Sequence, residues 1–588
     1  MNSDNYEFAK SSHPQSVSEY SSYSDKQWNY VSDINSGVYS NNSGLTLVTW
    51  DLTSIYNAAG LSDVSDLYLA VPIVMVATCS VGAVIGTAPT AGYALCSLKS
   101  NYQNLIHQIE VSSNGKIVSD MQPFVNVVKN FQLLSQMSAT DLKATAPSLN
   151  INECLDNEKS VQWVTSTLTA GTPQIGIGLC NNKPFASAAP GVQVVAQNST
   201  QYNNAIYNRV SRIADSTVNN TFNAYYGTQG TTVGTSPATI LTVTQLNAEY
   251  KPYYTQSGGI MTWYDVAIIP LKLITDVCDK IGLVKKLDMG LRIYFNTGTV
   301  QANVLNAGGV SSYGPFTSNF SNTCPLTINY LNGSVAAGSY AAATTFITAG
   351  VFISKPPSTF GPTQLINLTN VASHPMPSCR CYYSQVKLDP QRMLTYVEEN
   401  RSKQIVYENF LYNQYTSIGI GATFSQLIQS GIKNPIGIVI IPLISTIASP
   451  ILGNAGFGFS QYGSPYDTCP ASYAPLSLTN LAVTLGGVNV MNTNIFYTFE
   501  NFMEQVSMAE SLTSADIGIS TGLINQSYWE QNRCYYVDLS RGRSADKDTM
   551  RNLCITFNNN SNVPIDVLVF TLYLDKFVID VETGIIIK

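Results

Sequence analysis

The chain has 588 residues and a formal net charge of −7, from 30 Lys and Arg against 37 Asp and Glu. Charged residues make up only 11% of the sequence, against about 25% in an average globular protein. The acidic balance excludes a histone-like or polybasic role, in which a protein grips phosphates by charge. Hydrophobic residues at 45% and aromatic residues at 10% exclude a disordered chain. The length fits either four domains of about 150 residues or two large β-sandwiches.

The 11 cysteines have irregular spacings, and the N-terminal residues carry neither a basic segment nor an apolar run of the kind that directs secretion. We therefore expect free thiols in a reducing compartment. Residues 1–43 are rich in Ser, Tyr and Asn and predict a flexible, acidic N-terminal arm. Strand signals begin directly after it, in the alternating segment Leu45–Leu52, and recur to the C-terminus.

Long stretches without charge occur at 67–98 and 434–466, and each exceeds the length that spans a bilayer. Both are interrupted by Pro and Gly and contain many Ser or Thr, so they predict buried strands and no membrane span. A third uncharged stretch, 293–354, is rich in Gly, Ser, Ala and Thr. It predicts a long excursion that packs against neighbouring chains.

Similar segments recur in the same order in the two halves of the chain. The middle pair carries the two-residue turns Asn114-Gly115 and Gly486-Gly487 between alternating apolar residues, which predicts two β-hairpins. An amphipathic helix is predicted after each hairpin, around Phe131 and around Phe502. The matching segments are Leu67–Ile73 with Gly437–Leu443, Ile109–Val118 with Leu481–Val490, and Leu291–Asn296 with Leu553–Asn558. We infer two copies of one β-rich domain, the first enlarged by insertions.

Seven charged residues between Lys387 and Lys403 mark the boundary between the halves. Asp389-Pro390 supplies a helix N-cap and a proline at the first helical position, which predicts a short exposed helix over 390–400. The predicted organisation is a flexible arm at 1–43, a first domain at 44–388 with large loop insertions, a linker helix at 389–403 and a second domain at 404–588.

Two successive domains of about eight short strands, each with a helix after a central hairpin, predict an all-β fold of two consecutive eight-stranded jelly-roll sandwiches. The order of these pieces resembles the major capsid proteins of the double jelly-roll lineage, most nearly those of virophages and Polinton-like viruses. The resemblance covers roughly 45–588, apart from the excursions 182–260 and 299–354. The matching pieces include the hairpin and helix at 109–136, Ile269–Leu273, Leu291–Phe295, Leu388–Pro390, Asn434–Pro442, Tyr535–Arg541, Leu553–Phe557 and Val567–Leu574.

Three copies of a chain with two similar sandwiches present six similar lobes, so a homotrimer tiles a hexagonal lattice that closes into an icosahedral shell. A Tyr-rich surface with few charges suits the repeated interfaces of such a shell. We therefore expect the major capsid protein of a small double-stranded DNA virus, assembled inside the host cell and located in the virion. The resemblance implies penton and minor capsid proteins as partners. The alternative is a viral attachment protein or a lectin-like binding protein.

No catalytic, cofactor-binding or metal-binding residue is predicted, and the chain is not expected to be an enzyme. Of the three histidines, His13 lies in the arm and His107 lies in an alternating strand, where a structural imidazole is favoured over a catalytic one. The sharpest metal candidate joins His374 to Cys379 and Cys381, with Cys324 as a possible fourth ligand. Because Cys379-Arg-Cys381 alternates as a strand, packed thiols are favoured over zinc.

Charge clusters also receive a structural interpretation. Glu398-Glu399 lies on the predicted linker helix, which favours a solvated face over a pair of catalytic carboxylates. Lys285-Lys286 and Arg541-Gly-Arg543 either contact packaged DNA or form salt bridges between subunits. Two charges give little affinity for phosphates, so salt bridges are favoured and contact with DNA is expected to be weak at most.

Overall fold

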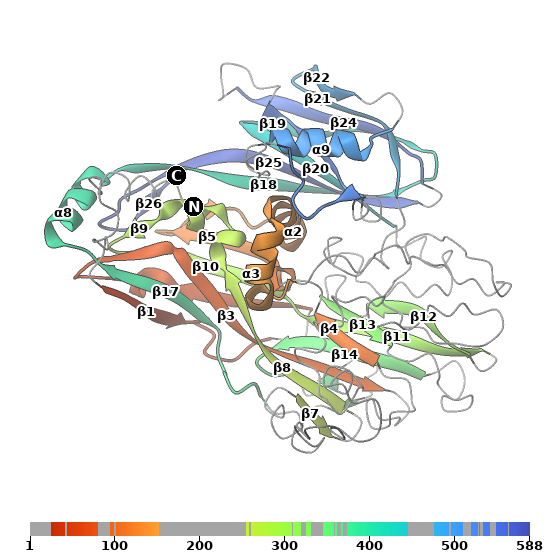
Figure 1. Cartoon of the computed structure of the whole chain (residues 1–588), viewed down its shortest axis with the longest axis horizontal. Coiled ribbons are helices and arrows are strands. Elements are labelled where there is room, and N and C mark those ends of the chain that lie inside the picture. Colours follow the sequence, from red (N-terminus) through yellow and green to blue (C-terminus); the bar gives the residue numbers. More distant parts are fainter. Residues whose placement is uncertain are drawn as a thin grey trace, which may run out of the picture.

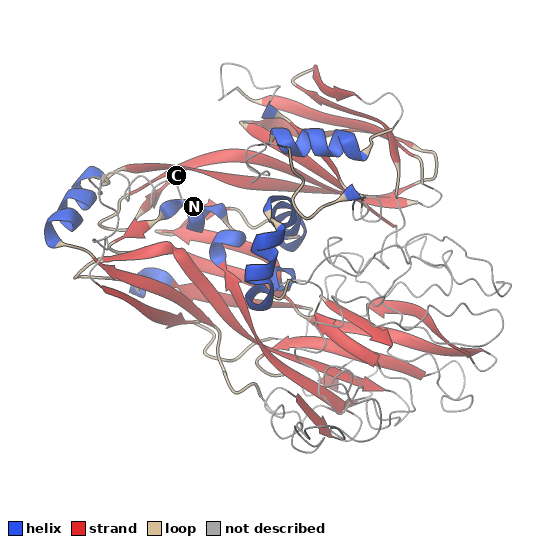
Figure 2. Cartoon of the chain, viewed as in Figure 1, coloured by secondary structure: helices blue, strands red, loops and turns tan. Residues whose placement is uncertain are grey.

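The protein is built mainly from antiparallel strands, with a few short helices (Figure 2). Its structure is a computed structural model. The described residues are 25–40, 44–79, 94–98, 102–151, 254–257, 260–307, 310–318, 325–330, 345–357, 359–360, 366–367, 373–444, 476–492, 496–509, 519–526, 529, 533–540, 549–561 and 564–588.

The first half forms a sandwich of two antiparallel sheets. If its eight principal strands are lettered B to I in chain order, one sheet reads B-I-D-G and the other reads C-H-E-F. This strand order is that of a jelly roll. The first sheet contains β1 (Asp25–Ser32), β17 (Arg380–Lys387), β3 (Leu61–Cys79) and β8 (Ile260–Pro270), and the second contains β2 (Leu45–Asp51), β10 (Gly290–Asn296), β5 (Ile106–Ser113) and β6 (Lys116–Ser119).

The second half repeats the arrangement. Its sheets again read B-I-D-G and C-H-E-F, so the prediction of two consecutive eight-stranded jelly rolls is confirmed. The first sheet contains β18 (Lys403–Ile418), β25 (Ile565–Ile579), β20 (Pro435–Ile444) and β23 (Tyr535–Asp538), and the second contains β19 (Thr423–Ile432), β24 (Arg551–Asn559), β21 (Leu478–Leu485) and β22 (Val488–Asn492).

The repeated sequence segments occupy equivalent strands in the two jelly rolls. They form the D strands β3 and β20, the E–F hairpins β5-β6 and β21-β22, and the H strands β10 and β24. Asn114 and Gly115 have φ of 48° and 71°, and Gly486 and Gly487 have φ of 61° and 82°. Both central residues of each turn are therefore left-handed, which matches the twist of a tight hairpin.

A helix follows each hairpin, as the sequence predicts. In the first jelly roll it is α2 (Val125–Gln136), and in the second it is α9 (Phe499–Met508). These F–G helices, named for the strands they connect, are equivalent in topology. The first half also contains α3 (Ala139–Leu149), α7 (Asp276–Ile281) and the 3-10 turns η1 (Leu52–Ser54), η2 (Tyr102–Leu105) and η5 (Leu271–Leu273).

The N-terminal arm differs from its prediction. Its residues Asp25–Ser32 form β1, which pairs with β17 from Asp25↔Lys387 to Ser32↔Arg380. The segment alternates aromatic with polar side chains and completes the edge of the sheet, so its backbone groups are paired in the ladder. The first jelly roll therefore begins before residue 44. Residues 1–24 and 41–43 lie outside the described residues.

The excursion predicted at 293–354 consists largely of strands in the part that the structure describes, and its packing against neighbouring chains stays a prediction. Between residues 293 and 354 the chain forms strands that widen the first sheet. Strand β3 extends beyond the end of β17, and this part of its edge pairs with β14. The pairing runs from Ile73↔Ile353 to Cys79↔Ile347. Most of 182–260 lies outside the described residues. The added strands are β14 (Thr345–Ile353), β11 (Gly298–Ala307), β12 (Val310–Ser318), β7 (Tyr254–Ser257), β9 (Leu283–Val284) and the pairs β4 (Ala94–Leu98) with β13 (Leu326–Tyr330) and β15 (Thr359–Phe360) with β16 (Ile366–Asn367).

The two jelly rolls lie side by side, and α8 (Pro390–Glu399) joins them at one end (Figure 1). The helix begins as predicted, with Pro390 at its first position and the Asp389 carboxylate accepting a hydrogen bond of 3.0 Å from the Gln391 amide. The described parts of the uncharged stretches 67–98 and 434–466 are mainly the strands β3, β4 and β20. Among the residues described, no helix has the length and apolar character to span a membrane.

Candidate functional site

Helix α2 lies in the junction between the two jelly rolls (Figure 1). The Phe131 ring lies 5.9 Å from the ring of Tyr536 and 6.3 Å from that of Phe502, both in the second jelly roll. Phe124, which precedes α2, lies 5.1 Å from Tyr412 of β18. Ten of the twelve residues of α2 are buried, which requires a partner on every side of the helix. The second jelly roll is that further partner, and one hydrophobic core runs through both halves.

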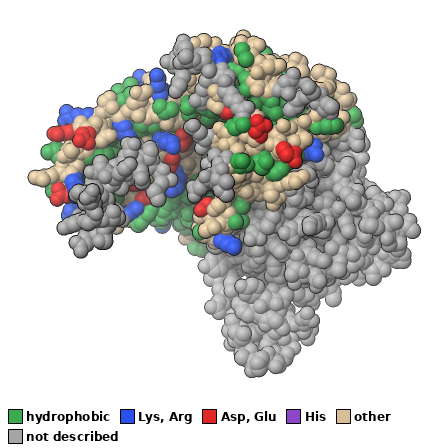
Figure 3. All heavy atoms as spheres, turned by 45° about the horizontal axis from the view of Figure 1, so that its top comes forward, with side chains coloured by type: hydrophobic (Ala, Val, Ile, Leu, Met, Phe, Trp, Pro, Cys, Tyr) green, Lys and Arg blue, Asp and Glu red, His purple; other side chains and the backbone are tan. Residues whose placement is uncertain are grey.

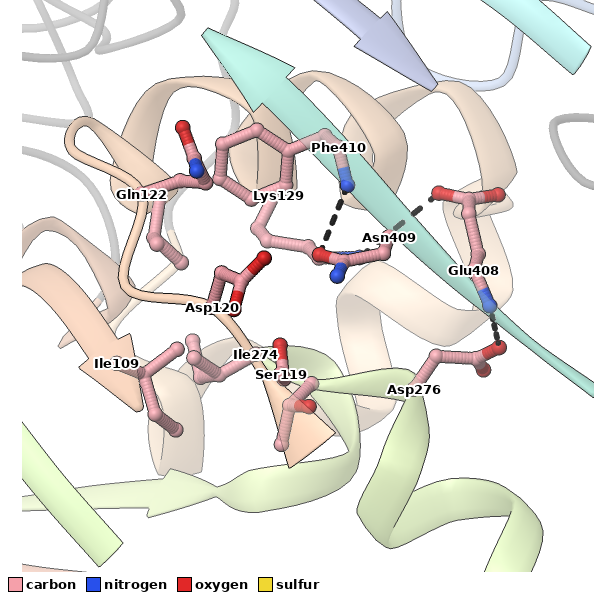
Figure 4. Close-up of a pocket in the computed structure, with 12 residues that line it drawn as sticks. Ile109, Ser119, Asp120, Gln122, Lys129, Ile274, Asp276, Glu408, Asn409 and Phe410 are labelled. Atoms are coloured by element: carbon pink, nitrogen blue, oxygen red, sulfur yellow. Dashed lines mark hydrogen bonds and ion pairs between the residues drawn. The ribbon is translucent and has the colours of Figure 1, made fainter. Parts of the chain in front are cut away.

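A charged cluster beside α2 fixes the position of β18 (Figure 4). The Glu408 carboxylate accepts a hydrogen bond from the Gln132 side chain and lies 3.9 Å from the Lys129 ammonium. The Glu408 amide donates a hydrogen bond of 2.7 Å to the carboxylate of Asp276 at the start of α7. The side chains of Lys129 and Glu408 are only 12% and 10% exposed. Removing one member of so buried a pair leaves the other without compensation.

The segment after β25 crosses to the first jelly roll. The carbonyl of Val581 accepts a hydrogen bond of 2.9 Å from the Lys285 amide, and the Ile586 amide donates one of 3.1 Å to the Ser113 hydroxyl. This segment includes the short strand β26 (Ile586–Ile587). The ammonium of Lys588 lies 2.7 Å from the carboxylate of Asp575 and donates to the Val118 carbonyl at 2.6 Å. The second jelly roll therefore holds the first through both backbone and side-chain contacts.

A glycine permits one close approach at the junction. Gly522, at φ +60°, lies against the backbone of α2, and a Cβ atom added to it would overlap the carbonyl oxygens of Leu134 and Ser135. The next residue, Leu523, donates a backbone hydrogen bond of 2.8 Å to the Leu134 carbonyl. This segment of the second jelly roll thus meets the C-terminal turn of α2 backbone to backbone.

The histidines lie in structural settings. His107 lies in β5 with its ring edge-to-face against Phe124 at 4.8 Å, and burial lowers its pKa to about 4. His374 accepts a hydrogen bond of 2.9 Å at Nδ1 from the Met376 amide, and burial lowers its pKa too. Both rings are therefore neutral near pH 7. His13 lies outside the described residues.

Cys379 and Cys381 are both fully buried, and Cys381 lies in β17, where its side chain faces the core. Burial raises the pKa of both thiols above the usual range, so they are uncharged packing groups. Both are free thiols, as are Cys278, Cys534 and Cys554. Cys324 lies outside the described residues. Within the described part of the chain, no three His, Cys, Asp or Glu side chains lie close enough to hold a metal ion.

The charge clusters named from the sequence fall on different parts of the fold. Lys285 forms a salt bridge of 3.9 Å with Glu582 of the same chain, which links the two jelly rolls. Glu582 also lies 3.7 Å from Arg401. Glu398 and Glu399 are exposed on α8. Arg541 and Arg543 lie outside the described residues.

An aromatic surface on the first jelly roll was missed by the sequence reasoning. Trp28 and Tyr30 of β1 are 49% and 50% exposed, and their rings contact Tyr68 of β3 and Tyr382 of β17. We call these four residues the aromatic ladder. They lie on the outer face of the B-I-D-G sheet, since the alternate residues Leu69 and Cys381 face the core. The alternation of Trp28 and Tyr30 with polar residues was the available signal.

Comparison with solved structures finds similar viral proteins. The structure of the Sputnik virophage matches with 9% identity and a TM-score of 0.48, covering 98% of this chain and 90% of that one. The mavirus major capsid protein matches with 10% identity and a TM-score of 0.41, covering 98% and 92%. The Faustovirus major capsid protein matches with 9% identity and a TM-score of 0.41, covering 98% and 94%. The chain resembles these proteins in fold. No family model matches it, and no curated protein matches it significantly.

The strand order found in both halves defines the chain as a double jelly roll independently of these similarities. The described side chains bring together no nucleophile with a base, and the polar cluster around Glu408 orients one jelly roll on the other. The features with functional meaning are therefore the rigid junction and the exposed surfaces of the two sandwiches.

Proposed function

We propose that this chain is the major capsid protein of a small double-stranded DNA virus, and that it assembles as a homotrimer into an icosahedral shell. The observation that carries the proposal is the pair of jelly rolls with one strand order, joined side by side through α2. Jelly rolls occur widely as capsid building blocks. A rigid pair supplies two similar lobes in fixed orientation, which a lattice subunit needs.

Three-fold symmetry turns this pair into a block with a hexagonal outline. Three copies present six similar lobes around one axis, and such blocks fill a plane without gaps. The low share of charged residues, 11%, suits surfaces that are buried repeatedly in contacts between blocks. The extra strands β11, β12 and β14 have no counterpart among the described strands of the second jelly roll, so the six-fold arrangement is approximate.

The proposal assigns the chain to the capsid shell of the virion, with other copies of itself as its main partners. Penton and minor capsid proteins are further proposed partners, and contact with the packaged DNA is at most weak because the chain is acidic overall. The proposed role is structural and not enzymatic. We also propose the division into two domains around 389–403, since α8 joins the last strand of the first jelly roll to the first strand of the second.

Light scattering on the purified chain, with negative-stain imaging of the same fraction, tests the proposal. We expect a particle near 191 kDa, three times the chain mass of 63.8 kDa, with a hexagonal outline. A monodisperse monomer that forms no lattice would contradict the capsid role. That outcome would favour the alternative of an attachment protein or a lectin-like binding protein.

A further inference from the structure

We propose that the aromatic ladder of the first jelly roll binds the surface around α9 on the second jelly roll of another copy of this chain. The inference rests on the proposed trimer and names the surfaces that close it. Its occupant is a second copy because the chain already contains an equivalent contact between its own two jelly rolls.

The contact between the two jelly rolls of one chain shows the arrangement expected for the contact between two chains, and we call either contact a joint. The outer face of the second B-I-D-G sheet carries Tyr412 and Phe570, whose rings lie 5.4 Å apart, and Tyr536. These aromatic residues are covered by the F–G helix of the first jelly roll, through Phe124 at 5.1 Å and Phe131 at 5.9 Å. An aromatic face on strands B, I and D or G thus packs beneath an F–G helix.

The first jelly roll carries an aromatic face at the equivalent place, where Trp28 and Tyr30 are half exposed. Tyr30 pairs with Tyr382 across β1 and β17, and Tyr382 pairs with Tyr68 across β17 and β3. The rings of Tyr68 and Tyr382 stack at 4.9 Å with an interplanar angle of 7°. Trp28 lies 5.5 Å from Tyr68 and continues the ladder at the sheet edge. Half-exposed aromatic residues on flat strands are typical of protein interfaces.

The second jelly roll carries the F–G helix that would cover this face. Phe502 and Val506 on one side of α9 are fully buried, whereas α2 is buried nearly all round. The opposite side of α9 presents Glu500, Glu504 and Met508, which are spaced four apart and therefore lie above one another on the helix. Met508 is 40% exposed, and Phe496, which lies before the helix in an isolated bridge with Thr479, is 55% exposed. Glu500 and Glu504 are exposed as well.

The exposed face of the second jelly roll has a matching character (Figure 3). Apolar and acidic side chains gather on the side turned toward the viewer, which lies away from the first jelly roll. Besides Phe496 and Met508, the exposed apolar residues of the second jelly roll include Val488 and Met550. A helix with an exposed side, in a jelly roll that carries other exposed apolar residues, is a candidate contact surface.

The charges on the two surfaces are complementary. The guanidinium of Arg380 lies over the Tyr30 ring at 4.6 Å, and no carboxylate pairs with Arg380 among the described residues. Glu500, which is exposed on α9, would bring negative charge to it. Within the chain the signs are reversed, since Lys129 of α2 meets Glu408 of β18. Because the aromatic ladder and α9 carry charges of opposite sign, a first jelly roll is expected to contact a second jelly roll of another chain. Contact between two like surfaces would bring equal charges together.

A joint between unlike surfaces is heterologous, so its repetition forms a ring or an open filament. In Figure 1, β1 and β17, which carry part of the aromatic ladder, lie at the left on the side of the first jelly roll that is turned away from the second, and α9 lies in the second jelly roll at the top. Each copy therefore offers the two surfaces on different jelly rolls, and three copies alternate six jelly rolls around the ring.

Site-directed cross-linking tests the placement. We expect a chain with both Tyr30→Cys and Phe496→Cys to be linked into a covalent trimer by a short bis-maleimide. A mixture of the two single variants should give linked dimers, and each single variant alone should give none. Linking of Tyr30→Cys chains to each other, or no linking by the double variant within a 191 kDa particle, would overturn the inference.

Charge reversal gives a second, independent readout. We expect Arg380→Glu to weaken trimer formation about tenfold, and the pair Arg380→Glu with Glu500→Arg to restore most of it. Arg401→Glu is the matched control, because Arg401 is 70% exposed, pairs with Glu582 and belongs to neither the aromatic ladder nor α9. Equal trimer formation by the wild type and Arg380→Glu, at unchanged thermal stability, would overturn the inference. A wild-type chain that is never a trimer would instead contradict the proposed function itself.

Discussion

At the scale of single residues, the junction depends on a buried charge. We expect Glu408→Ala to lower the free energy of unfolding by about 3 kcal/mol, because it leaves Lys129 in a buried position without its carboxylate. The same change removes the acceptor for the Gln132 side chain. Urea unfolding of the two proteins, followed by tryptophan fluorescence, measures the difference.

Glu582→Ala is the matched control for Glu408→Ala. Glu582 also links the two jelly rolls, through Lys285 and Arg401, but its side chain is 43% exposed. Solvent screens such pairs, so we expect a loss below about 1 kcal/mol. Equal losses for the two variants would contradict the view that burial makes the Glu408 cluster important.

His107 makes the fold sensitive to acid. Burial lowers the folded-state pKa of His107 to about 4 from 6.5. The unfolded chain therefore takes up the proton first as the pH falls. The contribution of the neutral His107 ring to the free energy of unfolding is fully present above about pH 6.5. It decreases between about pH 6.5 and 4 and is fully lost below that range.

The size of this effect follows from the pKa difference. For each protein, the free energy of unfolding at pH 4.5 is compared with that at pH 7.5. We expect this free energy to fall by about 2 kcal/mol more in the wild type than in His107→Gln. Glutamine cannot titrate, so this variant serves as its own control for packing changes. Urea unfolding at both pH values checks the prediction, and identical pH slopes would count against it.

The sequence predicted the strand positions of single residues whose neighbours alternate. His107 and Cys381 were correctly placed in strands because their neighbours alternate between apolar and polar. Trp28 and Tyr30 were assigned to a flexible arm, since the Ser, Tyr and Asn around them resemble a disordered segment. Their strand is stabilised by pairing with β17, more than 350 residues away, which no local pattern indicates.

At the scale of secondary-structure elements, the approach of α2 to the second jelly roll depends on Gly522. We expect Gly522→Ala to cost about 3 kcal/mol or more, because a Cβ atom there overlaps two carbonyl oxygens and the backbone is left-handed. Gly115→Ala is the control, since Gly115 has a similar φ of +71° and no atom lies within 4 Å of the added Cβ.

The control variant isolates the backbone cost from the overlap. Gly115→Ala should cost about 1 kcal/mol, the penalty for a left-handed residue with a side chain. Urea midpoints and slopes for both variants give the comparison. If the two alanines cost the same, the contact of Gly522 with α2 contributes nothing to the junction.

Elements with strong local signals were predicted well. The Asn-Gly and Gly-Gly turns, the Asp-Pro start of α8 and the alternating strands each carry their own sequence signature. The strands β11, β12 and β14 were missed, because their small residues give only weak alternation. They form because β3 is longer than β17 and offers an unpaired edge beyond Ala70.

At the scale of the whole molecule, the two jelly rolls behave as one body. We expect a chain cleaved at a protease site inserted after Glu399 to elute as the uncleaved chain does, and to unfold in one transition. The reason is that α2 and the segment after β25 hold the halves together without α8. Size-exclusion chromatography under native conditions checks this, with a denaturing gel to verify cleavage.

Release of two separate fragments after cleavage would contradict a continuous core. The sequence predicted two similar domains and the helix between them, but not their mutual orientation. That orientation depends on contacts such as Phe131 with Tyr536, which join residues 405 positions apart. Such pairs leave no periodic pattern in the sequence of either partner.

In the proposed trimer, the ten-residue helix α8 would have a consequence for the rate of assembly. In a ring of three copies with six joints, the three joints within chains form during folding, when covalent linkage gives the partners an effective concentration in about the millimolar range. Only the three joints between chains wait for collisions. A ring of six separate jelly rolls would need six such encounters, so fusing the jelly rolls in pairs shortens the path to a closed particle and leaves fewer incomplete rings in solution.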